Sequence, residues 1–123
     1  MQKLVFEEKW DKTIANADRF FIEKVFSELT LNDEDIIQFT PIRQAVNHKE
    51  DLLVTVIIHN TSGEGLSLNQ QKLSYMENDY LMAEETFFLP VVLPPFTSMP
   101  WTFIFPRKSI QHNASLKNGC LVI

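Results

Sequence analysis

The side chains best suited to acid–base chemistry in this chain are its histidines, and they are not grouped as a site. His48, His59 and His112 are scattered, and no two of them have the spacing of a zinc motif such as H-x-x-x-H. His59 ends a strongly apolar stretch, where a histidine bonded to a neighbouring turn is a better interpretation than a general base. We therefore expect no catalytic residue, no metal site and no cofactor.

The acidic residues and the thiol give no stronger signal for chemistry. The acidic run at residues 33–35 lacks the glycine and the distal glutamate of a calcium loop, which favours a solvated turn. Glu84 and Glu85 are neighbours in a predicted strand, where their side chains point to opposite faces and cannot share a proton. Cys120 is the only cysteine, so the chain has no internal disulfide and suits a reducing compartment.

Length and charge restrict the class of protein. The chain has 123 residues with 45% hydrophobic and 22% charged residues, proportions that predict one globular domain over residues 1–123. Its 16 acidic and 11 basic residues give a net charge of −5, which argues against nucleic-acid binding and against adhesion to anionic lipid. No stretch approaches the roughly 20 apolar residues of a membrane span, and the short apolar run at residues 4–6 predicts no signal peptide. We expect a cytoplasmic protein.

One amphipathic helix precedes the strands. Residues 11–17 read as a connection that leads into the helix, with Asn16 as its N-cap. Apolar residues then recur at helical spacing and predict one buried stripe. The residues of this stripe are Phe21, Ile22, Val25, Phe26 and Leu29.

Strand patterns dominate the remainder. The predicted strands are residues 3–6, 36–39, 42–46, 52–59, 66–68, 72–76, 80–89 and 101–105. Residues 52–59 are apolar on both faces, which predicts cover on both, and Pro41 indicates an edge strand or a bulge. The tail over residues 111–123 has a weak pattern and is predicted to be loosely held. This pattern predicts a mainly β fold, an immunoglobulin-like antiparallel β-sandwich with one N-terminal amphipathic helix packed on a sheet.

The proline-rich crossing over residues 90–100 is the candidate contact surface. It joins the predicted hairpin to the last strand, and loops of this kind lie at the surface and carry function. Phe96 and Met99 are the apolar side chains expected to be exposed there, flanked by Pro95 and Thr97.

Three segments together resemble a known family. They are residues 3–14, residues 52–68 and the block at residues 93–106, which reads LPPFTSMPWTFIFP. The combination resembles the SLAP domain family of Bacillus-type Gram-positive bacteria, named after an S-layer assembly protein associated with an accessory Sec system. The resemblance covers residues 3–110, carries over no catalytic residue, and implies a non-enzymatic module in a bacterial cytoplasm.

The leading hypothesis is a protein-binding or adaptor module that assists protein export or S-layer and envelope assembly. It would bind its protein partner through an exposed strand edge or the loop at residues 96–99. One alternative is a small-ligand-binding protein or cryptic enzyme, with His59, Glu85 and Tyr75 around a pocket between helix and sheet. Another is a structural homodimer formed through an edge strand.

Overall fold

Two facing β-sheets, two α-helices and a short 3-10 helix make up the computed structural model, which describes residues 2–123. The helices are α1 (Glu8–Thr13), α2 (Asn16–Glu28) and the short 3-10 helix η1 (Arg107–Ser109). The strands are β1 (Lys3–Leu4), β2 (Ile37–Val46), β3 (Leu52–Asn60), β4 (Gln71–Glu77), β5 (Tyr80–Phe87), β6 (Thr97–Phe105) and β7 (Gly119–Val122). The fold is mainly β, as predicted.

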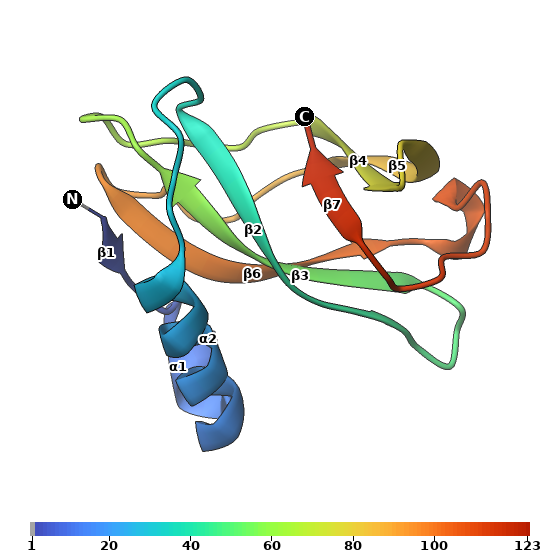
Figure 1. The fold of residues 1–123 in the computed structure, drawn as a ribbon, viewed down its shortest axis with the longest axis horizontal. Coiled ribbons are helices and arrows are strands. Elements are labelled where there is room, and N and C mark those ends of the chain that lie inside the picture. The colour runs from blue at the N-terminus through green and yellow to red at the C-terminus, as the bar shows by residue number, and fades with distance from the viewer. Residues whose placement is uncertain (1) are drawn as a thin grey trace.

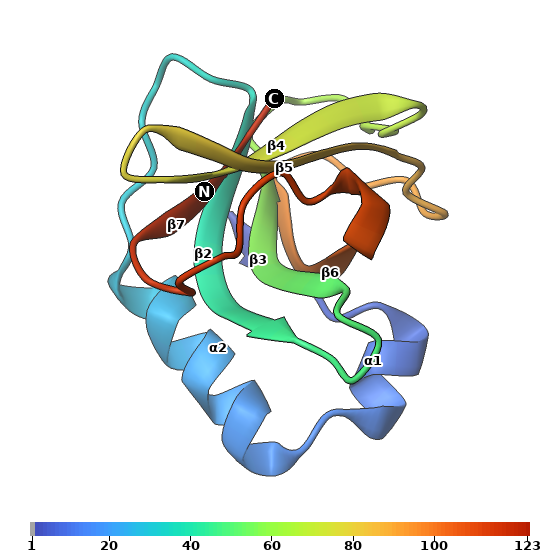
Figure 2. The same cartoon turned by 90° about the vertical axis from the view of Figure 1, so that its right-hand side faces the viewer.

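The two sheets and the helices form three layers. The first sheet has the strand order β1-β6-β3-β2, and the second has the order β5-β4-β7. Neighbouring strands are antiparallel, apart from β1, which runs parallel to the start of β6. Helices α1 and α2 lie beneath the first sheet, and the second sheet covers its opposite face (Figures 1 and 2). The predicted antiparallel sandwich with a helix on one sheet is therefore confirmed.

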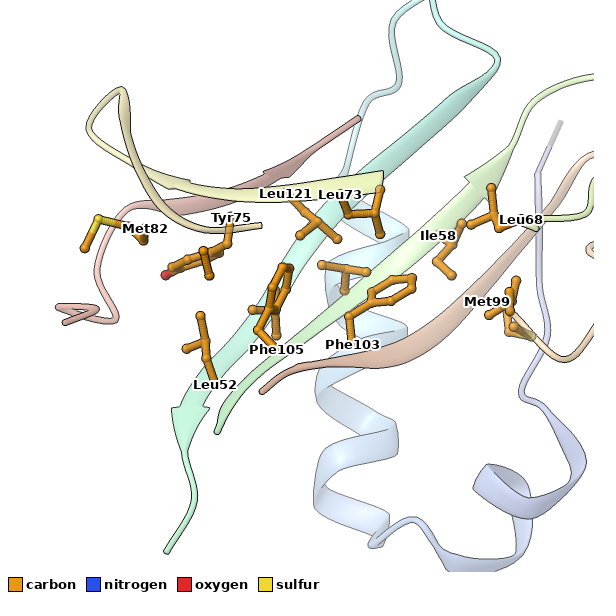
Figure 3. Close-up of a cluster of buried hydrophobic side chains, with 14 of the residues drawn as sticks. Leu52, Ile58, Leu68, Leu73, Tyr75, Met82, Met99, Phe103, Phe105 and Leu121 are labelled. Carbon is orange, nitrogen blue, oxygen red and sulfur yellow. The ribbon is translucent and has the colours of Figure 1, made fainter. Parts of the chain in front are cut away.

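The core fills the space between the sheets. Phe103 and Phe105 point into it from β6, where the sequence predicts a strand at residues 101–105, and both are almost fully buried. Phe87 of β5 meets both rings edge-on, with centroids 5.0 and 4.9 Å away. Figure 3 shows how residues of both sheets converge in this cluster. Each large apolar side chain buried there contributes about 2 kcal/mol, so the cluster is the main source of stability.

The central strand β3 is buried on both faces, as its apolar sequence predicted. Val54 and Ile58 face the second sheet, whereas Ile57 and His59 are fully buried on the opposite face. Ile22 of α2 is also buried, and it lines a hollow together with Thr55 of β3 and Thr102 of β6. A strand covered in this way can be apolar along its whole length, because neither face meets water.

A second helix precedes the predicted one. Residues 11–17 were expected to be a connection, but Glu8–Thr13 is helical. The carboxylate of Glu7 accepts hydrogen bonds from the amides of Lys9 (2.8 Å) and Trp10 (3.3 Å). This cap satisfies two amides that have no partner within the helix, which explains how so short a helix begins here.

The predicted helix itself is confirmed as α2, with two corrections. Asn16 is its first residue and not its N-cap, since Ala15 occupies the capping position without a side-chain bond. Phe21 was predicted on the buried stripe, but 47% of its surface is exposed. Phe21 is one of the residues that line a hollow between α2 and the sheet, so part of its surface stays open to solvent.

Two backbone features, one at a turn and one inside a strand, also match the sequence. The predicted hairpin is formed by β4 and β5, and Asn78 and Asp79 at its turn have φ values of 51° and 69°. Asparagine and aspartate tolerate this left-handed conformation better than most residues. The outer strand β2 continues through Pro41, and its register shifts between Pro41 and Arg43, which confirms the predicted edge strand with a bulge.

The tail beyond Gln111 is anchored at two points, so the expectation of a loosely held segment is wrong. Gly119–Val122 forms β7 and pairs with β4, and Leu121 is 5% exposed. The buried carboxylate of Glu77 also accepts hydrogen bonds from the amides of Ser115 and Leu116, both at 2.9 Å. The hydrophobic pattern of the tail is weak because much of what holds it is polar.

Tyr75 and Glu77 form a buried pair at this anchor. The Tyr75 hydroxyl donates a hydrogen bond of 2.6 Å to the Glu77 carboxylate. Burial, with the nearby carboxylate, raises the pKa of Tyr75. Burial alone would raise the pKa of Glu77, but its hydrogen bonds from Tyr75, Ser115 and Leu116 outweigh that effect and lower it. Glu77 is therefore ionised at neutral pH without a cationic partner among residues 2–123.

We expect Gly119→Ala to destabilise the fold by about 2 kcal/mol through overpacking. A Cβ atom at Gly119 would overlap the hydroxyl and ring of Tyr75, which lie directly against the glycine. The matched control is Gly63→Ala, because its Cβ would lie 3.7 Å from the Phe96 ring, an ordinary contact. Urea unfolding measures both variants, and equal free energies of unfolding would contradict this role of Gly119.

Candidate functional site

The predicted contact residues separate into two exposed and two buried side chains. Pro95 and Phe96 lie at the surface, and Phe96 exposes 47% of its area. Met99 is 5% exposed, so the prediction that it is exposed is wrong, and Thr97, which flanks Phe96, is 4% exposed. A role of Pro95 and Phe96 in partner contact stays a prediction.

The start of β6 explains this correction. The crossing was expected to run to Pro100, but β6 already begins at Thr97. Alternation along the strand then places Met99 on the same inward face as Phe103 and Phe105. Thr97 donates a hydrogen bond of 3.0 Å to the carbonyl of Pro95, which holds the residue before Phe96 in place.

Asn60, at the end of β3, holds the loops around Phe96 together. Its side-chain nitrogen donates to the carbonyls of Glu64 (2.8 Å), Pro94 (3.0 Å) and Leu93 (3.1 Å). Its side-chain oxygen accepts from the amide (3.0 Å) and the hydroxyl (2.7 Å) of Ser62. Asn60 is fully buried, so these bonds replace the water that its carboxamide would otherwise require.

Asn60 was not among the residues predicted to form a site. The signal that points to it is an asparagine at the end of an apolar strand, followed by Thr-Ser-Gly. Asparagine side chains commonly bond to the backbone two residues ahead, and Ser62 lies at that distance. The bonds to Leu93 and Pro94 have no local signal, because they join segments more than 30 residues apart.

Phe96 itself is fixed by its backbone. Its amide donates to the carbonyl of Ser62 (3.0 Å), and its carbonyl accepts from the amide of Lys3 in β1 (2.9 Å). It adopts φ of 50°, a conformation that costs about 1 kcal/mol or more for a residue with a side chain. The surrounding bonds impose this conformation, which presents the ring outward over Gly63.

The turn at residues 63–65 supports two exposed apolar side chains. The Phe96 ring lies over Gly63, and Val92 lies against Gly65, where an added Cβ would approach Val92 to 3.2 Å. Val92 is 61% exposed. We call Val92, Pro95 and Phe96 the apolar tip. Glycine at position 65 lets Val92 approach the turn closely, whereas a Cβ at position 63 would make an ordinary contact with the Phe96 ring.

A hollow of about 450 Å³ borders the apolar tip. Phe96, Phe26, Leu29 and Leu31 contribute apolar surface to it, and Gln2, Asn32, Asp33 and Thr61 contribute polar surface. A hollow of this size and mixed lining, beside an exposed aromatic ring, can receive one or two side chains of a partner. The site is thus suited to contact with another protein.

His59 and Ser98 have the spacing of a base and a nucleophile but not the access. The Ser98 hydroxyl lies 2.6 Å from Nδ1 of His59, and the Thr40 hydroxyl lies 2.7 Å from Nε2. Both His59 and Ser98 are fully buried, and burial lowers the pKa of His59 to about 4. The imidazole is neutral at pH 7 and links β2, β3 and β6. The sequence suggested that His59 bonds to a neighbouring turn, but it bonds to side chains of β2 and β6 instead.

The prediction that His59, Glu85 and Tyr75 lie together around a small-ligand site is wrong. His59 bonds within the first sheet, Tyr75 bonds Glu77 between the sheets, and Glu85 bonds the adjacent amide of Thr86. A hollow of about 190 Å³ does lie between α2 and the first sheet, but none of the three lines it.

Among residues 2–123, no three histidine, cysteine, aspartate or glutamate side chains are close enough together to hold a metal ion. None of the helices described there has the length and apolar character needed to cross a bilayer.

We expect stability to fall as the pH is lowered from 6.5 towards 4. His59 in the unfolded chain binds a proton below pH 6.5, whereas folded His59 binds one only near pH 4. The unfolded state therefore binds more protons in this window, and acidification costs up to about 3 kcal/mol.

The variant His59→Gln removes this titration while keeping hydrogen-bonding capacity. Urea unfolding across the window is expected to show a flatter pH dependence for His59→Gln than for the natural chain. His48→Gln, at an exposed turn, is the matched control. An unchanged pH dependence of the unfolding free energy in His59→Gln would show that the buried imidazole does not cause the loss of stability.

Comparison with known proteins assigns the family. The family model for the SLAP domain matches residues 4–119, nearly the whole chain, and confirms the resemblance seen in the sequence. No curated protein and no solved structure matches the chain. The matched range includes Asn60, the apolar tip and Glu77. Because the match covers nearly the whole chain, the chain belongs to the SLAP domain family.

Proposed function

We propose that the chain is a non-enzymatic protein-binding module whose contact surface is the apolar tip. The observation that carries the proposal is a rigid, exposed aromatic ring: Phe96 is held by backbone bonds on both sides and borders a partly apolar hollow. Exposed aromatic residues on a rigid base are favourable anchors, because little side-chain freedom is lost on binding.

The cellular role proposed here follows from the family. Membership of the SLAP domain family supports a role in S-layer or cell-envelope assembly, and protein export is the step at which a cytoplasmic module would act. The net charge of −5 supports a protein partner over nucleic acid. The buried Ser98 and His59 also favour binding over catalysis, since substrate does not reach them in this arrangement.

We expect Phe96→Asp to abolish partner capture while the fold is kept. A charge at position 96 would remove the aromatic anchor and would meet a desolvation cost in any apolar interface. Tyr80→Asp is the matched control, because Tyr80 is 71% exposed at the hairpin turn and lies outside the apolar tip.

The measurement is affinity capture from a Gram-positive lysate with quantitative mass spectrometry, followed by binding assays with the purified partner. Proteins captured by the natural chain and by Tyr80→Asp should be absent with Phe96→Asp. Full recovery with Phe96→Asp, at an unchanged melting temperature, would rule out the apolar tip as the contact surface.

A further inference from the structure

The outer edge of β2 has backbone groups without a hydrogen-bond partner. β2 is the last strand of the first sheet and pairs only with β3. The amide of Thr61 donates to the carbonyl of Ile36, which fixes the alternation along this antiparallel pair. Gln38 and Thr40 therefore bond to β3, whereas the amides and carbonyls of Ile37 and Phe39 face outward. Nothing in residues 2–123 bonds to these outward groups.

This free edge is short because Pro41 and the irregularity after it interrupt the strand. Pro41 has no amide to offer, and the register shift after it turns the strand. Long exposed edges promote aggregation, and a proline with a bulge limits that risk. A stretch of one or two outward residues can pair with a short peptide, whereas a continuous sheet between two copies would need more.

A groove runs along the same stretch of β2. It has a volume of about 400 Å³ and lies between β2 and the end of β7. Ile37, Gln38 and Phe39 line it on one side, and Leu121 and Val122 line it on the other. The two strands lie near one another at this side of the sandwich (Figures 1 and 2). A strand added to β2 would therefore lie in the groove, with apolar side chains against β7.

The charge at one end of the groove is negative. Asp35 lines the groove, and Asp33 and Glu34 precede it on the same exposed loop. None of these three carboxylates forms an ion pair with the residues described, and the groove lining contains no lysine or arginine. A basic side chain of a partner would find an unneutralised acidic group beside the free edge.

We infer that the β2 edge binds an extended peptide segment of a partner protein, with alternating apolar residues and a lysine or arginine next to Asp35. Backbone bonds to Ile37 and Phe39 supply affinity, and the side chain of Phe39, which packs edge-on against Phe103, keeps the edge rigid. This site deepens the proposed function, since it rests on the chain being a protein-binding module.

The test follows individual amides by NMR hydrogen exchange with a defined probe. The probe is a short capped peptide of alternating valine and threonine with a lysine at one end, titrated to millimolar concentration. In the free protein the amides of Ile37 and Phe39 should exchange fast and those of Gln38 and Thr40 slowly. With peptide, Ile37 and Phe39 should slow by about tenfold or more.

Substitutions in the chain and in the peptide distinguish pairing at the β2 edge from a general effect on the fold. Ile37→Pro removes an outward amide without breaking a bond to β3, and should abolish peptide protection at Phe39. Gln44→Pro is the matched control, because Gln44 faces outward on the same edge beyond the bulge and outside the groove. Asp35→Asn, or a glutamate in place of the peptide lysine, should weaken binding several-fold.

Four results would overturn the inference. They are no protection at Ile37 and Phe39 with peptide, unchanged binding by Ile37→Pro, shifts confined to the apolar tip, and protection that rises with protein concentration alone, which would indicate a second copy. Failure here is distinct from failure of the proposed function. Partners lost with Phe96→Asp but retained with Ile37→Pro would leave the proposed function standing and remove only this site.

Discussion

The buried carboxamide of Asn60 bonds to two loops that are far apart in the sequence, and the shape of the surface near Phe96 depends on it. Both of its polar atoms are satisfied, by carbonyls of residues 64, 93 and 94 and by Ser62. These bonds set the path of the chain into β6. Because Phe96 bonds to Ser62, the position of its ring follows from the same network.

A second polar anchor, Glu77, lies towards the other end of the core. Tyr75, which bonds to it, and Met99, near the Asn60 end, occupy opposite ends of the apolar cluster in Figure 3. The apolar cluster stabilises the sandwich, but the hydrophobic effect has no preferred direction and does not fix the position of a loop. Asn60 and Glu77 do fix loop positions, because hydrogen bonds require specific geometry. The fold thus combines a large apolar core with two buried polar anchors, Asn60 and Glu77. The apolar tip lies beside the Asn60 anchor, and the other exposed feature is the free edge of β2.

The sequence allowed prediction of the elements that depend on periodicity. The strands at 52–59 and 101–105, the hairpin and the edge position of Pro41 all follow from local pattern and turn chemistry. Helix α1, with its local Glu7 cap, was missed, and two further errors occurred where contacts distant in sequence decide. The buried bonds of Glu77 to Ser115 hold a tail whose pattern is weak, and pairing of β6 from Thr97 onward buries Met99. Neither contact leaves a local signature, because its partners are distant in sequence.

The most direct test of this account replaces Asn60 with aspartate and measures amide hydrogen exchange. The substitution keeps the shape but presents a carboxylate, without donors, to three carbonyl oxygens. We expect the amide of Phe96 to lose most of its protection, while the amides of Ser115 and Leu116, held by Glu77, stay protected. Protection of Phe96 at the natural level would contradict the claim that Asn60 positions the apolar tip.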